Sequence, residues 1–273
     1  MRALAAVPAD LRPAPALLDV RDPAAFAAGH LAGSGHLPRA ELPPRERSLL
    51  VLADDPGEAA AAAEALEAMG YADVAWLKTP LERLPGGHDD RAPAARLWQP
   101  APFLAEVLPV ILAAGALAPG RAADLAAGSG RDAVFLALHG FAVEAWDHAP
   151  EALDRAVALA RRNAVAIEPV VADLERGEPP LPESRYQLVV VFRYLHRPLF
   201  PAIARALAPG GWLVYETYRK GQERFGRPRS ARFLLEPGEL AAAFPGLEVV
   251  RSEEPAPPSG PIVARLLARR PAS

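Results

Sequence analysis

The sequence between residues 124 and 147 is DLAAGSGRDAVFLALHGFAVEAWD. Its pattern predicts a short strand, a glycine-rich turn, a helix and a second strand that ends in an acidic residue. Gly128 and Gly130 permit a tight turn in which the backbone can approach a ligand with no Cβ in the way. Asp147 ends the second strand, where a carboxylate can accept hydrogen bonds from both hydroxyls of a ribose. This order of elements is typical of a site for a nucleotide-like ligand.

Asp124 narrows the choice of ligand. In a dinucleotide fold the first strand usually runs apolar into the glycines, and a pyrophosphate rests on the helix N-terminus, so a carboxylate there would repel it. A cationic ligand is compatible with Asp124, and S-adenosylmethionine carries an amino group, a sulfonium and a ribose but no phosphate. Two alternatives stay open, because Gly128, Gly130 and Ala133 also satisfy the relaxed dinucleotide fingerprint and similar turns occur without a ligand.

The segments that follow continue the alternation of strands and helices. Residues 170–173 (VVAD) predict a third strand that ends in Asp173, whose carboxylate could meet an adenine amino group. Residues 186–192 (YQLVVVF) are a near-continuous apolar run, which is typical of a parallel strand buried on both faces. A helix that ends at Pro-Gly-Gly is predicted over residues 198–211, and a strand over residues 212–218.

From Asp124 onward the chain resembles class I S-adenosylmethionine-dependent methyltransferases, above all the small tellurite-resistance and thiopurine types. The resemblance covers roughly residues 100–270 and implies a Rossmann-like seven-strand domain with S-adenosylmethionine as the cofactor. It also implies an antiparallel strand pair at the end, for which residues 247–254 and 262–270 are candidates. Ala126 stands where many members have glycine. The cofactor-binding residues implied by the resemblance are Asp124, Ala126, Gly128, Gly130, Asp147, His148, Asp173, Leu174 and Phe192.

The methyl acceptor is expected beyond the strand at residues 186–192, because ligands bind outside the carboxyl ends of parallel strands. The next segment, FRYLHRP, lacks the Asn/Asp-Pro-Pro-aromatic sequence of many amino-directed nucleic-acid methyltransferases, which argues against a nucleobase acceptor. His196 and Tyr194 are the candidate catalytic residues. His196 could act as a general base, since an unperturbed imidazole titrates at about pH 6.5. Local packing or hydrogen bonding is the alternative role for both residues.

Residues 218–240 concentrate basic and aromatic side chains between the fifth strand and the next helix. The family carries substrate-facing insertions at this place, so the segment is predicted to form a lid over the acceptor. Basic and aromatic residues together suit an anionic small molecule or an RNA strand, whereas a solvated loop is the plain alternative. The expected substrate-facing residues are Arg193, Glu216, Tyr218, Arg224, Phe225 and Arg227.

Residues 17–38 and 48–77 resemble a rhodanese-like domain. In active rhodaneses the loop after the middle strand carries a cysteine that holds a persulfide. The corresponding stretch here is residues 53–58, and the chain contains no cysteine at all. Without a thiolate there is no nucleophile for sulfur transfer, and the acidic residues of this stretch would oppose an anion. Sulfurtransferase activity is therefore predicted to be absent.

Length and composition are consistent with a two-domain α/β protein, because 273 residues with 51% hydrophobic content can form two cores. The predicted organisation is a rhodanese-like domain over residues 1–84, a linker over 85–99 and a methyltransferase domain over 100–273. A formal net charge of −3 provides no general basic field for nucleic acid. The uncharged stretch between Glu106 and Arg121 is too short to span a bilayer, which needs roughly 20 apolar residues.

The sequence thus predicts a cytoplasmic enzyme that transfers a methyl group from S-adenosylmethionine to a small, anionic or soft-nucleophilic molecule. No secretory signal is apparent, since Asp10 and Arg12 interrupt the apolar start. No nucleic-acid, membrane or metal partner is expected. An RNA-modifying methyltransferase, a noncatalytic S-adenosylmethionine-binding protein and a dinucleotide oxidoreductase are the alternatives.

Overall fold

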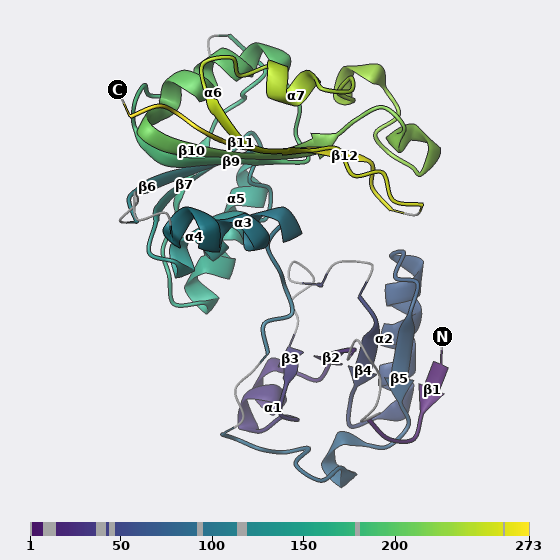
Figure 1. Ribbon diagram of the computed structural model, residues 1–273. Coiled ribbons are helices and arrows are strands. Elements are labelled where there is room, and N and C mark those ends of the chain that lie inside the picture. Colours follow the sequence, from purple (N-terminus) through teal and green to yellow (C-terminus); the bar gives the residue numbers. More distant parts are fainter. Residues whose placement is uncertain are drawn as a thin grey trace. The chain divides into compact units, whose positions relative to one another are not determined.

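The computed structural model describes residues 2–7, 15–36, 42–43, 47–91, 95–113, 119–177, 181–258 and 260–272. Asp10, Arg12 and residues 114–118 lie outside these ranges. The chain forms two compact units, Met1–Gln99 and Pro100–Ser273, and each combines helices with one sheet (Figure 1). The predicted fold class, two α/β domains, is confirmed. No helix among the described residues is long and apolar enough to cross a membrane.

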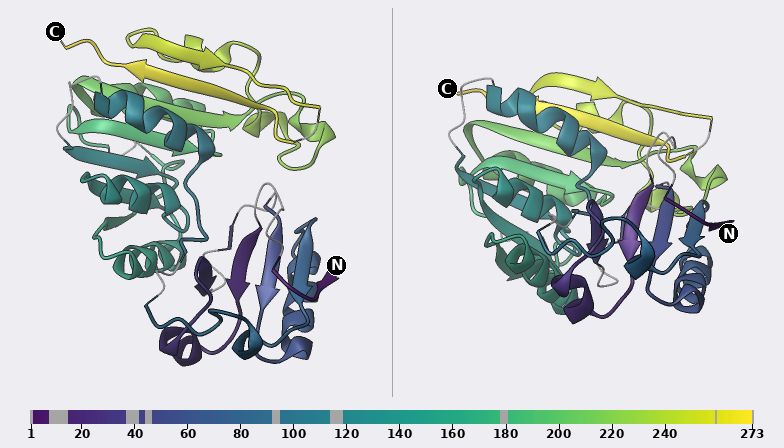
Figure 2. Two further views of the ribbon diagram at one scale, coloured as in Figure 1. Left: turned by 60° about the horizontal axis from the view of Figure 1, so that its bottom comes forward. Right: turned by 90° about the horizontal axis from the view of Figure 1, so that it is seen from below.

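The first unit contains a five-stranded, all-parallel sheet in the order β1-β5-β4-β2-β3 (Figure 2). The central strand β4 has the sequence LLVL and is buried at every position, as expected of a parallel strand covered on both faces. Among the described residues of this unit, two α-helices and one 3-10 turn accompany the sheet. The elements are β1 (Arg2–Leu4), β2 (Ala16–Asp19), α1 (Pro23–Ala28), β3 (Ser34–His36), β4 (Leu49–Leu52), α2 (Pro56–Ala68), β5 (Val74–Leu77) and η2 (Leu81–Arg83).

Part of the segment 85–99, predicted as a linker, packs on the first unit. Asp89 and His30 form an antiparallel bridge, and the Ala95 N–H donates to the Ser34 carbonyl at 2.9 Å. Leu97 is buried in the apolar cluster that contains β2, β4 and α2 residues.

The second unit contains a seven-stranded sheet in the order β11-β12-β10-β9-β6-β7-β8. Strands β6 to β10 are parallel to their neighbours within that group, and β12 is antiparallel to both β10 and β11. The order reverses between β6 and β9, which places a ligand crevice at their carboxyl ends. The strands are β6 (Arg121–Leu125), β7 (Ala142–Asp147), β8 (Glu168–Val171), β9 (Tyr186–Phe192), β10 (Leu207–Tyr218), β11 (Glu248–Glu253) and β12 (Val263–Arg269).

Helices cover both faces of this sheet. One apolar cluster joins the sheet to α6 and α7, and a second joins it to α3, α4 and α5, so the two groups lie on opposite faces in Figure 1. The helical elements are α3 (Pro102–Ala113), α4 (Arg131–Leu138), α5 (Pro150–Arg162), η3 (Arg197–Leu199), α6 (Phe200–Ala206), η4 (Gln222–Arg224), η5 (Ala231–Phe233) and α7 (Glu239–Ala242).

The transition from α6 to β10 differs from the prediction. The helix ends at Ala206, and Leu207 already pairs with Tyr186 on β9. The register then shifts before Trp212, so Pro-Gly-Gly at residues 209–211 lies within an irregular strand start. A Cβ on Gly211 would stand 2.8 Å from the Tyr186 carbonyl oxygen. These residues therefore form a bulge against β9, and the predicted helix through residue 211 is wrong.

Candidate functional site

A cavity of about 650 Å³ lies at the carboxyl ends of β6, β7, β8 and β9. We call it the first cavity. Parallel strands end on the same edge of the sheet, which is why side chains distant in sequence meet here. Its lining residues are Ala126, Asp147, His148, Ala172, Asp173, Leu174, Glu175, Arg176 and Tyr194.

Asp147 lines the first cavity and accepts a hydrogen bond from the glycine turn. Its Oδ2 accepts a hydrogen bond from the Gly128 N–H at 2.8 Å, and its Oδ1 accepts one from the Ala149 N–H at 2.9 Å. The exposed His148 ring lies with Nδ1 3.2 Å from Oδ1. A carboxylate offers about four acceptor positions, so Asp147 keeps acceptor capacity for a ligand although only 8% of the residue is exposed.

The glycine turn combines backbone strain with close packing. Gly130 has φ +74°, and a Cβ there would lie 2.4 Å from the Ala156 Cβ on α5, so glycine allows α4 to begin against α5. Ala126 lines the first cavity and also has a positive φ of 59°. For a residue with a Cβ this conformation costs about 1–2 kcal/mol, which explains the glycine expected at this position from the resemblance.

Two buried acidic side chains, Asp124 and Asp132, accept backbone hydrogen bonds next to the glycine turn. Asp124 is 2% exposed, and its Oδ2 accepts a hydrogen bond from the Ala133 N–H at 2.9 Å. Asp132 accepts one from the Ala101 N–H at 2.7 Å. Burial raises the pKa of Asp132 to about 6. Burial, together with the charge of Asp132, also raises the pKa of Asp124 well above its ordinary value. A cation bound nearby would favour the ionised form of both groups.

The segment after β8, next to Asp147, supplies a further part of the lining of the first cavity. Asp173 Oδ1 accepts a hydrogen bond from the Glu175 N–H at 2.9 Å, and its Oδ2 lies 3.2 Å from Arg176 Nε. Leu174 adds an apolar surface beside these polar groups. This part of the lining thus offers a carboxylate and an apolar contact within two neighbouring residues.

A second cavity, of about 900 Å³, lies beyond β9 and β10 and shares Tyr194 with the first. Its lining contains arginines and aromatic rings but no acidic residue among those described. The lining residues are Arg193, Tyr194, Leu195, Thr217, Tyr218, Gly226, Arg227, Pro228, Arg229, Ser230 and Phe233.

Tyr194 stands at the boundary of the two cavities. The Tyr215 hydroxyl donates to its carbonyl oxygen at 3.0 Å and fixes its backbone. Its own hydroxyl is buried and has no hydrogen-bond partner among the described residues. Burial raises the phenol's pKa, with the charges of Glu175 and Asp173 adding to the effect. The group is therefore a neutral hydrogen-bond donor at physiological pH.

Two contacts hold the Arg193 guanidinium, one with the Tyr218 ring and one with Glu216. Arg193 has a positive φ of 58°, and its guanidinium lies 4.7 Å from the centre of the Tyr218 ring. Its Nη2 lies 3.0 Å from Glu216 Oε1, and Arg265 Nε donates to Glu216 Oε2 at 2.6 Å. Glu216, which is 1% exposed, therefore neutralises Arg193 from below instead of facing the cavity.

Other predicted site residues lie outside both linings. His196 precedes η3, and Phe192 packs partly buried against the apolar cluster of α3 and α4. Arg224 lies over the Phe225 ring at 5.8 Å. Thr217, Arg229 and Phe233, which belong to the strand end and the basic segment expected near the acceptor, line the second cavity. The lining residues that the sequence did not single out are Leu195, Gly226, Pro228 and Ser230 in the second cavity, and Ala172, Glu175 and Arg176 in the first.

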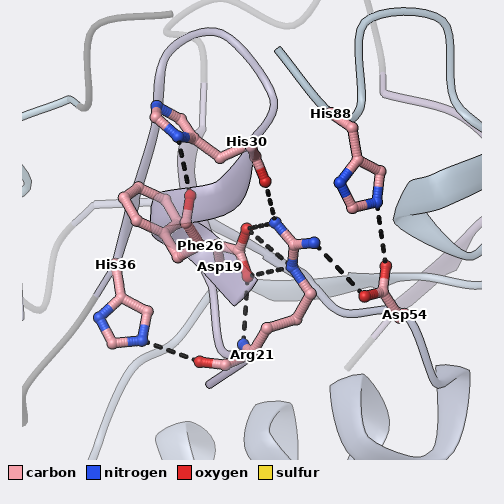
Figure 3. Close-up of polar contacts among 8 residues, drawn as sticks. Asp19, Arg21, Phe26, His30, His36, Asp54 and His88 are labelled. Carbon is pink, nitrogen blue, oxygen red and sulfur yellow. Dashed lines mark hydrogen bonds and ion pairs between the residues drawn. The ribbon is translucent and has the colours of Figure 1, made fainter. Parts of the chain in front are cut away.

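The corresponding strand ends of the first unit are occupied by an ion-pair network (Figure 3). Arg21 Nη2 donates to Asp19 Oδ2 at 2.8 Å and to the Gly29 carbonyl oxygen at 2.8 Å. Its Nη1 donates to Asp54 Oδ2 at 3.3 Å, and His88 Nε2 lies 3.9 Å from the other Asp54 oxygen. Asp54 directly follows β4 and Ala53, so a carboxylate stands in the loop where active rhodaneses bind sulfur.

Asp55, the next residue, occupies backbone N–H groups at the end of the same loop, where α2 begins. Asp55 caps α2, and its Oδ1 accepts a hydrogen bond from the Glu58 N–H at 2.8 Å. Pro56 at the first helical position provides no N–H. The helix N-terminus is therefore satisfied by the chain's own carboxylate.

Comparisons with known proteins match a region in each of the two units. The family model of the rhodanese-like domain matches residues 5–82, and that of a methyltransferase domain matches residues 122–211. No curated protein shows a significant match to the chain.

Three solved structures share the fold with a TM-score of 0.50. One belongs to work on the conversion of a disulfide bond into a thioacetal group during echinomycin biosynthesis; it is 22% identical and covers 64% of this chain and 82% of its own. The [4+2]-cyclase SpnF is 14% identical and covers 62% and 82%. A sarcosine dimethylglycine methyltransferase assigned in Galdieria sulphuraria is 17% identical and covers 62% and 84%.

These likenesses show the fold alone, and one neighbour is a cyclase, so the reaction has to be argued from the site. The family match implies S-adenosylmethionine as the cofactor. The residues present fit it: Asp147 has free acceptor positions, Asp173 follows the neighbouring strand β8 in the same lining, and a bound cation would favour the ionised forms of Asp124 and Asp132. The chain therefore combines a rhodanese-like domain with a methyltransferase domain of the S-adenosylmethionine-dependent type.

Proposed function

We propose that the protein transfers a methyl group from S-adenosylmethionine in the first cavity to a small, anionic or soft-nucleophilic acceptor in the second. The observation that carries this proposal is that the two cavities adjoin at Tyr194 and differ in charge. Acidic and hydrogen-bonding groups line the first, which suits a cationic donor with a ribose. Arginines and aromatic rings line the second.

On the donor side, Asp147 would accept hydrogen bonds from the ribose hydroxyls and Asp173 from the adenine amino group. Burial raises the pKa of both Asp124 and Asp132, and the positive end of a bound donor would favour their ionised forms, so binding and ionisation would support each other. Arg131, the first residue of α4, has a buried Nε without a partner among the described residues, which a donor carboxylate would satisfy.

When bound, the cofactor supplies an activated methyl group: the acceptor's lone pair bonds to the methyl carbon while the carbon–sulfur bond breaks and its electron pair stays on sulfur. The protein's contribution is alignment and exclusion of water. Tyr194 would orient the acceptor as a neutral hydrogen-bond donor. His196, which precedes η3, is the candidate to receive an acceptor proton.

Donor affinity and its dependence on Asp147 test the assignment. Each charge-assisted hydrogen bond to a ribose hydroxyl contributes about 1.5–3 kcal/mol, so Asp147→Ala should weaken S-adenosylhomocysteine binding by about tenfold or more in a calorimetric titration. Asp154→Ala, an exposed aspartate on α5, is the matched control and should bind like the wild type. Equal affinity in the Asp147 variant would reject this role.

Acceptor classes can then be screened by release of S-adenosylhomocysteine. Turnover of a small anionic or soft nucleophile is the expected result. Binding of the donor without turnover of any acceptor class would favour a noncatalytic role.

We also propose that the first unit has no sulfurtransferase activity. The chain lacks cysteine, and Arg21, Asp54 and Asp55 fill the loop after β4 with their own ion pair and helix cap. Ala53→Cys should therefore leave thiocyanate production from thiosulfate and cyanide at the uncatalysed rate. Activity in either the wild type or this variant would contradict the proposal.

A further inference from the structure

We propose that the acceptor is an organic acid with a planar, apolar body, and that Arg227 and Arg229 bind its anionic group. This inference rests on the proposed function, because it assigns the second cavity to the acceptor. It narrows the acceptor from two chemical classes to one and gives specificity-determining roles to Arg229 and Phe233, which the sequence analysis placed in the basic and aromatic segment 218–240.

The charge balance around the second cavity is uneven. Most basic side chains near its walls are neutralised by acidic partners: Lys220 pairs with Glu236, Arg197 with Glu239 and Arg232 with Glu175. Arg219 and Arg193 also face carboxylates, of Glu254 and Glu216. Among the described residues Arg224 has no such partner, but it lies outside the lining and over the Phe225 ring.

Arg227 and Arg229 differ from these residues. Both line the second cavity, and within the described part of the chain neither has a carboxylate at ion-pair distance. The lining itself contains no acidic residue among those described. About two positive charges therefore face the cavity without compensation, and a carboxylate or phosphate group is the partner that a guanidinium binds best.

Aromatic rings form the rest of the binding surface. The Tyr218 ring is held by the Arg193 guanidinium stacked at 4.7 Å, and the Phe233 ring lies 5.2 Å from the Arg232 guanidinium. Each ring thus has a guanidinium group against it, and both belong to the lining of the cavity. Leu195 and Pro228 add apolar contact. Aromatic walls favour a flat, apolar ligand body that can stack on them.

The same charge balance disfavours RNA. Binding of a nucleic-acid strand needs a continuous row of uncompensated cations along the backbone. Here Lys220, Arg232 and Arg197 are paired with acids. The uncompensated cations therefore form one local group that can bind a single anion, and not a continuous row along a nucleic-acid strand. A cavity of about 900 Å³ also matches a small molecule.

Matched pairs of probes test the anionic contact. The probes are benzoate, phenyl phosphate and naphthalene-2-carboxylate, each compared with a neutral counterpart: benzamide, benzyl alcohol and 2-naphthamide. They are titrated calorimetrically into the full chain with and without saturating S-adenosylhomocysteine. We expect each anion to bind at least about tenfold more tightly than its neutral counterpart, because only the anion pairs with the guanidinium groups.

Variants assign the effect to residues. Arg227→Gln combined with Arg229→Gln should remove the preference for the anions, whereas Arg161→Gln, an exposed arginine on α5, should leave it unchanged. Phe233→Ala should weaken the naphthalene probes of either charge by a few-fold and keep the preference for the anion. Melting temperatures of all variants check that the fold is intact.

The outcomes separate the two proposals. Equal binding of charged and neutral probes, no binding of any probe, or an unchanged preference in the double variant would overturn the inference. Tighter binding of a single-stranded RNA oligomer than of the acids, lost in the double variant, would replace it with RNA recognition. If S-adenosylhomocysteine itself fails to bind, the proposed function fails, whatever the acids do.

Discussion

The two units place charged residues at the same structural position, the carboxyl ends of parallel strands, but use them differently. In the first unit, Asp19, Arg21 and Asp54 satisfy one another (Figure 3). In the second, Asp147 and Tyr194 line a cavity and keep hydrogen-bonding capacity for a ligand. A strand end becomes a binding site only where its polar groups are left incompletely paired.

Arg21 illustrates the paired case. Its Nε, Nη1 and Nη2 all donate hydrogen bonds within the unit, and the residue is 4% exposed. The hydrogen bond to Asp19 raises the pKa of Arg21 further. A group held in this way contributes to the fold and has little left to offer a ligand, in contrast to Arg227 and Arg229 in the second cavity.

Removing Arg21, the ion-pair partner of Asp19 in the first unit, should cause the largest change, a loss of folding stability. Asp19 is fully buried, and Arg21→Met would leave its charge without compensation, so we expect a loss of about 3–5 kcal/mol in the free energy of unfolding. Urea denaturation monitored by circular dichroism measures it. The double variant Asp19→Leu, Arg21→Met should recover part of the loss, and Arg83→Met, an exposed arginine, should change little. A stability change below about 1 kcal/mol for Arg21→Met would show that the pair is dispensable.

Replacing Tyr194, which lines both cavities of the second unit, should give a smaller effect, on the turnover rate. Tyr194→Phe removes the buried hydroxyl, which has no hydrogen-bond partner among the described residues; we expect turnover to fall by about tenfold with donor affinity unchanged. His196→Asn is the comparison. A general base at this position would lower turnover by about 10²–10⁴ and change the pH profile. Full turnover of the His196 variant from pH 6 to 9 would remove that residue from the mechanism.

The buried carboxyl of Asp132, beside the glycine turn, should give the smallest effect, which is a pH dependence of the free energy of unfolding. Burial raises the pKa of Asp132 from its ordinary 3.8 to about 6, so the folded state favours the protonated carboxyl. Its stabilising contribution is complete below about pH 4 and is lost as the pH rises through 6. Asp132→Asn is neutral throughout and keeps the acceptor for the Ala101 N–H.

Thermal melts at several pH values measure this difference. We expect the Asn variant to match the wild type near pH 4 and to melt at least about 2 °C higher at pH 7.5. Asp154→Asn on the exposed face of α5 should show no such divergence. Parallel melting curves for wild type and Asp132→Asn across this range would contradict the assignment.

Local sequence was sufficient to predict those elements whose conformation depends only on neighbouring residues. The apolar run of β9, the glycine turn and Asp147 all follow from short patterns, and the fold class was predicted from them. Pairing between distant residues was not predictable. Leu207 joins β9 through a contact with Tyr186, and this contact ended α6 earlier than the Pro-Gly-Gly sequence suggested.

The same limit applies to charges. The sequence showed a basic segment but not which of its members meet acids, since Arg232 finds Glu175 from 57 positions away. It also showed that Asp54 would oppose an anion, but not that Arg21 holds it, 33 positions distant. Which cations stay free, and hence where a ligand binds, depends on tertiary contacts.

Donor binding to the full chain decides whether the incompletely paired strand ends of the second unit form a cofactor site. Calorimetric titrations of the wild-type protein with S-adenosylhomocysteine and with NAD make the comparison under one set of conditions. We predict that S-adenosylhomocysteine binds at one site per chain and more tightly than NAD, because it carries an ammonium group and no phosphate, whereas the acidic side chains of Asp124 and Asp132 beside the glycine turn disfavour a pyrophosphate. Tighter binding of NAD, or no binding of S-adenosylhomocysteine, would contradict the account.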